Sequence, residues 1–224
     1  MESLWEKTAE IPDFGRLEND INTDVLIIGG GMAGVLCAYM LHQAGVDYVL
    51  AEASRICSGI TKNTTAKITS QHGLIYDKLI RKFGVIKAGL YLRANEEALE
   101  RYRKLCEGIA CHFEMKDNVV YSLHDRKKID KEIAALQTLG YPAQWLDNLP
   151  LPFPVAGAVK FPGQAQFNPL QFVAGITQGL RIYEHTTVRE FIGTTAVTDR
   201  GKIKAKKIII ATHFPILNKH GLYF

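Results

Sequence analysis

The segment from Asp24 to Gly34 constrains the fold of this 224-residue chain more than any other. A short apolar run, Val25–Ile28, leads into glycines with the spacing Gly29-x-Gly31-x-x-Gly34. The first glycine allows a sharp turn, the second lets a pyrophosphate approach the backbone, and the third lets a helix pack closely against a strand. This spacing after an apolar run predicts a turn that binds a dinucleotide.

The residues that follow supply the context that such a turn requires. An apolar helical stretch, Met32–Gln43, comes next, and a strand, Asp47–Ala51, leads to the acidic residue Glu52. The free N–H groups and the positive dipole end of the helix would hold the phosphates. One alternative is a glycine-rich turn in an ordinary βαβ unit. Another is a membrane span over the uncharged residues 25–41, but this stretch is shorter than the ~20 residues that a span needs.

The composition narrows the class of protein. The length corresponds to one large or two small domains, and a hydrophobic content of 47% is enough for a sizeable core. The net charge of +4 is mild, and no basic stripe is interleaved with aromatic residues, so we expect no nucleic-acid partner. Because the N-terminus is acidic, it is unlike a signal peptide. We therefore expect a cytoplasmic protein without a membrane span.

The four cysteines are too few for a disulfide scaffold in a chain of this length. Cys106, Cys111 and His112 lie close together in the sequence, but they offer only two or three metal ligands and no partner pair. We therefore expect buried or idle thiols rather than a metal site.

Periodicity and turn residues predict an α/β chain with a long loop at residues 53–75, whose length without a period is typical of a functional loop. The predicted helices are Tyr76–Phe83, Val85–Glu107, Lys127–Leu139 and Asn168–Gln178. The predicted strands are Val119–Leu123, Ala158–Phe161, 181–184, 187–192, 194–198 and Lys206–Ala211. The apolar positions Leu90, Ala94, Ala98, Tyr102 and Leu105 form a helical stripe, and Ile208–Ile210 is typical of a buried parallel strand.

Two further segments carry a family resemblance when they are taken together with the glycine turn and Glu52. They are the basic-flanked apolar strand Lys206–Thr212, which ends in Ala-Thr, and the threonine-rich loop Asn63–Lys67. With them, the chain resembles the FAD-dependent D-amino-acid oxidase superfamily, which includes glycine oxidase, sarcosine oxidase and D-amino-acid dehydrogenase. It looks closest to a bacterial subgroup whose members often carry a Rieske iron–sulfur domain at the C-terminus.

The resemblance implies an α/β fold with a Rossmann-like FAD-binding domain, built as a parallel sheet around the βαβ unit, and part of a substrate domain with a mixed or antiparallel sheet. We divide the chain into an irregular N-terminal arm (1–22), the FAD-binding βαβ unit with the flavin loop (23–83), a substrate-side insertion of helices and strands (84–165) and a return to the FAD-binding domain (166–224). Trp5 and Phe14 are expected to pin the arm to the body.

The resemblance also assigns residues to FAD. They are Gly29, Gly31, Met32, Ala33, Gly34, Glu52, Ala53, Ser54, Thr61, Thr64, Thr65, Ala66, Val188, Ala211 and Thr212. In this assignment the glycine turn holds the pyrophosphate and Glu52 takes the adenosine ribose. Val188 pairs its backbone with adenine, and the threonine-rich loop runs past the flavin ring.

Three charged or titratable residues each have two alternative roles in this scheme. Lys67 is the catalytic candidate, since a cation near the flavin ring would favour the reduced, anionic flavin; a surface lysine is the alternative. His72 and His213 are each either a polar contact to the site or a structural histidine. His213 also stands where the family usually has glycine after Ala-Thr.

The predicted function is oxidative deamination or dehydrogenation of an amine or amino acid by hydride transfer to flavin N5. Family members end in a Gly-Asp motif, and neither that dipeptide nor the ligand pattern of a Rieske centre occurs in the chain. We therefore expect the N-terminal part of an oxidase, whose electron acceptor or Rieske portion lies outside this chain, with weak FAD binding by the chain alone. An NAD-dependent dehydrogenase and a non-catalytic FAD-binding fragment are the alternatives; Glu52 disfavours NADP.

Overall fold

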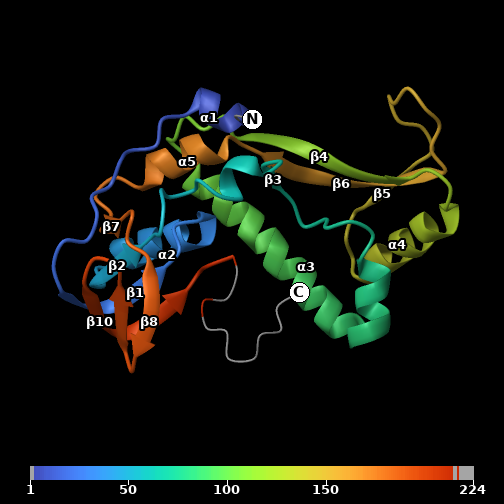
Figure 1. Ribbon diagram of the computed structural model, residues 1–224. Coiled ribbons are helices and arrows are strands. Elements are labelled where there is room, and N and C mark those ends of the chain that lie inside the picture. Colours follow the sequence, from blue (N-terminus) through green and yellow to red (C-terminus); the bar gives the residue numbers. More distant parts are fainter. Residues whose placement is uncertain (1–2, 214–215, 217–224) are drawn as a thin grey trace. The chain divides into compact units, whose positions relative to one another are not determined.

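The computed structural model describes residues 3–213 and residue 216 (Figure 1). Internal contacts divide the chain into two compact units, and each is described by itself. The first unit comprises the described residues up to Thr65 and from Pro169 onward, and the second unit comprises Ala66–Asn168. The residues between 66 and 83, which the sequence-based division joins to the FAD-binding domain, thus have most of their contacts within the second unit.

The first unit is built on a six-stranded sheet in the order β7-β2-β1-β10-β9-β8. Strands β1, β2, β7 and β10 run parallel to one another, whereas β9 and β8 are added in antiparallel pairs. The strands are β1 (Ile21–Ile28), β2 (Tyr48–Ala51), β7 (Ile182–Tyr183), β8 (Val188–Ile192), β9 (Thr195–Thr198) and β10 (Lys202–Ile210). The helices are α1 (Leu4–Thr8), α2 (Met32–Gln43), α5 (Pro169–Ile176) and the 3-10 turn η1 (Thr61–Asn63). The expected parallel sheet around a βαβ unit is confirmed.

The core of the first unit is formed by side chains of the central strands and of β9. Leu26, Ile28 and Val49 are buried there beside Ala205 of β10. The expected parallel pairing of the last strand is confirmed, since β10 runs beside β1 in register. The expected burial of Ile208–Ile210 is wrong, because Ile208 and Ile209 are half-buried and Ile210 exposes 43% of its surface.

The N-terminal segment is more regular than its sequence suggested. Helix α1 begins with a capping box, in which the Ser3 hydroxyl accepts from the Glu6 amide and the Glu6 carboxylate accepts from the Ser3 amide. The indole Nε1 of Trp5 donates to the carbonyl of Thr64 at 2.8 Å, as a pinning role would require. The expectation of an irregular arm is therefore wrong at residues 4–8, because the capping box satisfies the backbone groups that a short helix leaves unpaired.

The second unit is an antiparallel sheet with helices packed on one face. Its strands follow the order β3-β6-β4, with β5 also paired to β6. The core contains Tyr76, Ile129, Leu136, Val159 and Phe161. The strands are β3 (Lys67–Ile68), β4 (Glu114–Ser122), β5 (Gln144–Leu146) and β6 (Gly157–Gln166), and the helices are α3 (Tyr76–Leu105) and α4 (Arg126–Thr138). This separate antiparallel sheet confirms the expected second element of the fold.

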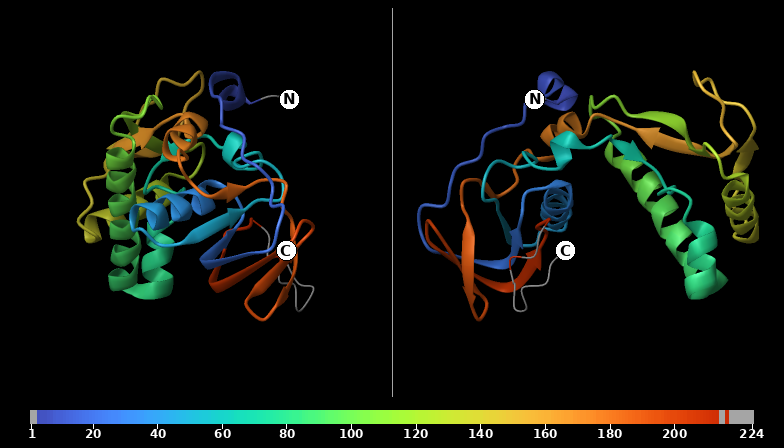
Figure 2. Two further views of the ribbon diagram at one scale, coloured as in Figure 1. Left: turned by 90° about the vertical axis from the view of Figure 1, so that its left-hand side faces the viewer. Right: turned by 45° about the vertical axis from the view of Figure 1, so that its right-hand side comes forward.

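Helix α3 is broken at Gly84, whose backbone angles (φ 81°, ψ 162°) are not helical. Figure 2 shows the chain changing direction between a short blue-green helical segment and the longer green one. The prediction of two helices meeting at this glycine is confirmed, since only glycine adopts such angles without strain. The buried face of α3 lies on Ala88, Leu92 and Leu99, whereas Leu90 of the predicted stripe is 52% exposed.

Candidate cofactor site

The glycine turn joins β1 to α2 beside the end of β10. The amide of Gly29 donates to the carbonyl of Ala51 at 2.9 Å, and the amide of Ala211 donates to the carbonyl of Ile28 at 2.8 Å. Gly29 has a φ of +104°, and a Cβ there would lie 2.7 Å from the carbonyl oxygen of Ala211. A Cβ at Gly34 would lie 1.9 Å from the carbonyl oxygen of Gly29. Both positions therefore require glycine for the close approach of backbones.

Gly31 differs from these two glycines because open space lies in front of it. A Cβ at this position would meet only the Thr61 hydroxyl, at 3.8 Å. The next amide, that of Met32, donates to the same hydroxyl at 3.2 Å. Helix α2 begins here with Gly31 as its N-cap and no side-chain cap. The open space thus faces a helix N-terminus, which favours an anionic ligand such as a pyrophosphate.

The Glu52 carboxylate is held beside this turn by backbone donors. One oxygen accepts from the amide of Gly30 at 2.6 Å and the other from the amide of Ser54 at 2.8 Å. Glu52 is half-buried and lines the same cavity as the turn. A carboxylate oriented in this way can also accept from a sugar hydroxyl, because each of its oxygens has a second lone pair.

The turn opens onto a cavity of about 760 Å³ that lies wholly within the first unit. The predicted FAD-binding residues that line it are Gly29, Gly31, Met32, Ala33, Glu52, Ala53, Thr61, Val188, Ala211 and Thr212. The predicted residues outside the lining are Gly34, Ser54, Thr64, Thr65 and Ala66. The tertiary structure thus brings two segments that follow β7 and β10 to the glycine turn.

Thr212, which lines the cavity, has a buried hydroxyl without a hydrogen-bond partner among the described residues. The Oγ1 atom of Thr212 is inaccessible to solvent, and no described residue is bonded to it. Since buried polar atoms in folded proteins are nearly always satisfied, this hydroxyl leaves an unmet hydrogen bond that a polar ligand group would satisfy. Together with the open space at Gly31 and the start of α2, where the N-cap residue has no side chain, it fits a phosphate-bearing dinucleotide.

Lys67, His72 and His213 have different surroundings. Lys67 is exposed on β3 of the second unit, where it pairs in register with Gln166. His72, in the same unit, is exposed and its Nε2 lies 3.2 Å from the Oδ1 of Asn95. His213 lines the cavity of the first unit. Of these three residues, only His213 is placed at the cavity.

Several cavity residues carried no signal of their own in the sequence. They are Arg55, Cys57, Ser58, Gly59, Ile60, Thr186 and Thr187. Most lie in the loop that follows β2, within the segment that its length had marked as functional. Burial, together with the nearby charges of Glu52 and Glu184, raises the pKa of the Cys57 thiol to about 12. A thiol that stays protonated at neutral pH is not a nucleophile, so Cys57 serves packing rather than chemistry.

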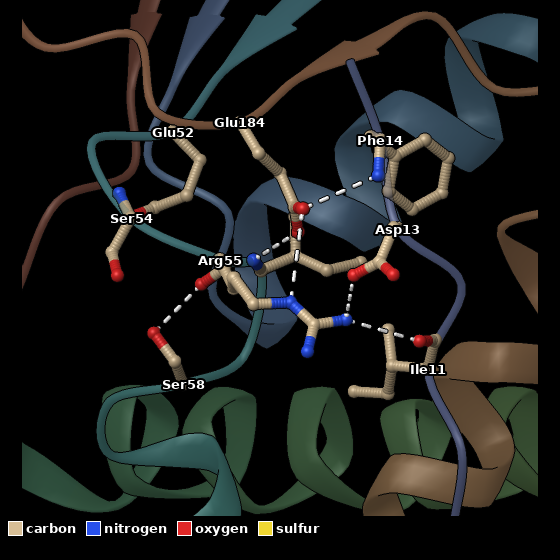
Figure 3. Close-up of polar contacts among 9 residues, drawn as sticks. Ile11, Asp13, Phe14, Glu52, Ser54, Arg55, Ser58 and Glu184 are labelled. Carbon is tan, nitrogen blue, oxygen red and sulfur yellow. Dashed lines mark hydrogen bonds and ion pairs between the residues drawn. The ribbon is translucent and has the colours of Figure 1, made fainter. Parts of the chain in front are cut away.

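Behind the cavity wall, the carboxylate of Glu184 connects two distant segments (Figure 3). It accepts from the amide of Ile56 at 2.7 Å and from the amide of Phe14 at 3.2 Å. The guanidinium of Arg55 lies between this carboxylate, at 3.9 Å, and Asp13, at 2.5 Å. Only 1% of the Glu184 surface is exposed, so the carboxylate is a buried part of the wall rather than a ligand group in the cavity.

Comparison with known protein families identifies the family of this chain. The sequence profile of a family described as FAD dependent oxidoreductase (DAO) matches residues 24–220. The chain belongs to this family. FAD is therefore its cofactor, and the alternative of an NAD-dependent dehydrogenase is excluded. The resemblance to the D-amino-acid oxidase superfamily is confirmed.

Individual relatives agree with this assignment. The chain is 36% identical to YhfW of Bacillus subtilis (strain 168), which is named as a Rieske 2Fe-2S iron-sulfur protein, over 99% of this chain and 46% of that protein. It is 24% identical to the gamma-glutamylputrescine oxidoreductase of Escherichia coli (strain K12), over 88% of this chain and 50% of that protein. The chain thus spans about half the length of these two relatives.

The fold has close structural counterparts. The crystal structure of glycine oxidase from Geobacillus kaustophilus superimposes with a TM-score of 0.68, covering 85% of this chain and 55% of that chain at 20% identity. Sequence identity at this level supports the fold and not the substrate. Among the described residues, no helix combines the length and the hydropathy that crossing a bilayer requires.

Proposed function

We propose that the chain contributes the FAD-binding part of an oxidoreductase that oxidises a small amine or amino acid at its C–N bond. The observation that carries the proposal is the cavity at the glycine turn, with open space in front of Gly31 and the unsatisfied hydroxyl of Thr212. Bound FAD would supply the two-electron acceptor for this oxidation. The named activity of the gamma-glutamylputrescine relative supports an amino compound as the substrate.

Different residues around the cavity would bind different parts of the cofactor. The amides at the start of α2 would hold the pyrophosphate, because they lie at the positive end of the helix. Glu52, already oriented by two backbone amides, would accept from the adenosine ribose. We assign the backbone of Val188 to adenine and the segment from Thr61 to Lys67 to the flavin side. In this scheme Lys67 is a cation that favours the reduced flavin.

The first experiment is spectroscopic. The purified chain should bind added FAD, and amines and amino acids added without oxygen should bleach the flavin absorption if the chain is competent for turnover. The matched control is Gly31→Val, whose side chain occupies the open space assigned to the pyrophosphate. FAD binding that is no tighter than that of this variant would contradict the proposed site.

A second candidate is a chain that binds FAD without turnover. It is favoured by one fact: the chain spans about half the length of its relatives. Side-by-side assay of this chain and a longer protein that also contains the region matching the second half of those relatives separates the two candidates. Reduction at equal rates supports a self-sufficient oxidase, and reduction only in the longer protein supports the second candidate.

The identity of the electron acceptor can also be tested by comparing rates. The name of the Bacillus subtilis relative motivates a Rieske iron–sulfur group as acceptor, which we propose for the longer protein. Reoxidation of the reduced flavin by oxygen, compared with reoxidation by a Rieske protein, measures the preference directly. Fast reoxidation by oxygen alone would contradict the Rieske assignment.

A further inference from the structure

Glu184 lies in the connection between β7 and β8, and its buried carboxylate gathers donors from two segments that are far away in the sequence. The amide of Ile56 is 128 positions away and the amide of Phe14 is 170 positions away. Each donates to a different carboxylate oxygen. Because both oxygens are used, a neutral amide side chain at this position would turn an N–H group toward one of these donors.

The Phe14 side of this contact belongs to a segment, residues 11–17, that is held at several points. The guanidinium of Arg55 donates to the carbonyl of Ile11 at 3.2 Å and pairs with Asp13. The amide of Glu184 itself donates to the carbonyl of Gly15 at 3.1 Å. Residues 11–17, which we call the arm segment, are therefore anchored to the Glu184 connection by backbone and side chain together.

The Ile56 side of the contact leads to the cofactor cavity. Residues Ala53, Arg55, Cys57 and Ser58 line the cavity, and Ile56 lies among them. The amide of Cys57 donates to the carbonyl of Gly30 at 2.8 Å. A Cβ at Gly30 would lie 2.7 Å from the Cγ2 atom of Ile56, so the Ile56 side chain packs directly on the glycine turn. Any shift of Ile56 therefore reaches the turn.

We propose that Glu184 is a positioning residue for the cofactor cavity, through which the arm segment sets the position of Ile56 and, with it, of the glycine turn. Arg55 shares this role, since its guanidinium joins the arm segment while its side chain lines the cavity. The proposal rests on the proposed function, because the cavity is taken to hold FAD. It adds that Glu184, which does not line the cavity, determines how tightly the adenosine half of the cofactor is bound.

The test compares Glu184→Gln with Glu190→Gln, a matched control that removes an exposed carboxylate from β8. Dissociation constants for FAD and for ADP are measured well below the melting temperature of each variant. We expect Glu184→Gln to weaken both ligands about tenfold or more, because the wall is displaced. We expect the control to remain within about twofold. A lower melting temperature with unchanged dissociation constants would overturn the proposal and leave Glu184 a purely stabilising residue.

A measurement on the unaltered chain keeps the proposal testable if Glu184→Gln does not fold. Binding of ADP should slow amide hydrogen exchange at Ile56 and also at Phe14, although Phe14 does not line the cavity. Slower exchange at Ile56 with no change at Phe14 would overturn the proposal. If the unaltered chain bound neither FAD nor ADP, the proposed function would fail and this inference with it. Tight binding that Glu184→Gln leaves unchanged would remove the inference alone.

Discussion

The two units each bury one glutamate almost completely, and the two carboxylates serve different ends. Glu184 in the first unit and Glu132 in the second are both 1% exposed, and both accept hydrogen bonds from backbone amides. Glu132 accepts from Ile75, Tyr76 and Asp77 at 2.9–3.1 Å, which are the donors left unpaired at the start of α3. Glu184 instead joins two loops and has a guanidinium 3.9 Å away.

The roles of the two buried carboxylates differ because their surroundings differ. Burial raises the pKa of Glu132, and the three amide hydrogen bonds lower it by less. Glu132 therefore caps a helix although burial disfavours its charged form. Glu184 has a cation beside it and stands behind a cavity wall, where it orders a ligand site rather than a helix. The first unit is organised around a cavity and the second around its core, so we expect mutations in the two units to have different effects.

The largest effects are expected at the glycine turn of the first unit. Gly34→Ala should abolish FAD binding and lower the free energy of unfolding by about 3 kcal/mol or more, because its Cβ would meet the Gly29 carbonyl. Gly31→Val should also abolish binding but leave folding intact, since space is open in front of Gly31. Isothermal calorimetry and urea unfolding separate the two. Gly89→Ala in the second unit, whose Cβ would make only an ordinary contact with Leu139 at 3.7 Å, is the control, and binding retained by Gly34→Ala would contradict the account.

The second unit should be most sensitive in its core. Phe161 is fully buried and packs on Tyr141 and Tyr76, with ring centroids 4.6 and 6.0 Å away. Phe161→Ala should cost about 3–5 kcal/mol of unfolding free energy. Phe153→Ala, at a ring that is 42% exposed, should cost less than about 1 kcal/mol. Urea unfolding followed by tryptophan fluorescence measures both, and equal losses would show that Phe161 is not a core residue.

An intermediate effect is expected at Glu52. Glu52→Ala should weaken FAD binding by about 1–3 kcal/mol, because it removes charge-assisted hydrogen bonds to the turn and to the ribose. Glu52→Gln should lose less, and Glu52→Arg should lose more. Titration of each variant with FAD gives the dissociation constants. Identical values in all four proteins would mean that Glu52 is an ordinary surface carboxylate.

The smallest expected effect is the pH dependence that Glu132 contributes. Its pKa in the folded chain is raised above the ordinary value of 4.5, so the folded chain holds more protons than the unfolded chain between these two values. Its stabilising contribution is therefore complete below pH 4.5 and is lost as the pH rises through the raised pKa. Glu132→Gln should remove this decline. The free energy of unfolding is measured against pH in a Trp5→Phe background, where Trp145 is the remaining tryptophan and reports on the second unit. Equal slopes of this free energy against pH with Glu132 and with Glu132→Gln would contradict the assignment.

Local features were predictable from the sequence because their causes are local. The turn at Gly29–Gly34 follows from steric limits that only glycine satisfies, and the break at Gly84 has the same origin. The parallel pairing of the strand that contains Ile208–Ile210 followed from its apolar core, and the cofactor followed from the family. Less predictable was the short helix α1, because a capping box at a chain end competes with an irregular arm and little else marks it.

The contacts between distant segments are determined by the tertiary structure alone. The sequence by itself determined the glycine turn, the acidic residue after the second strand and the family. It could not show that Glu184 joins Phe14 to Ile56, or that Glu132 caps α3 from 55–57 positions away. Such hydrogen bonds depend on which segments the fold brings together, and a glutamate carries no sign of its partners. Their strength arises from burial, which only the assembled core creates.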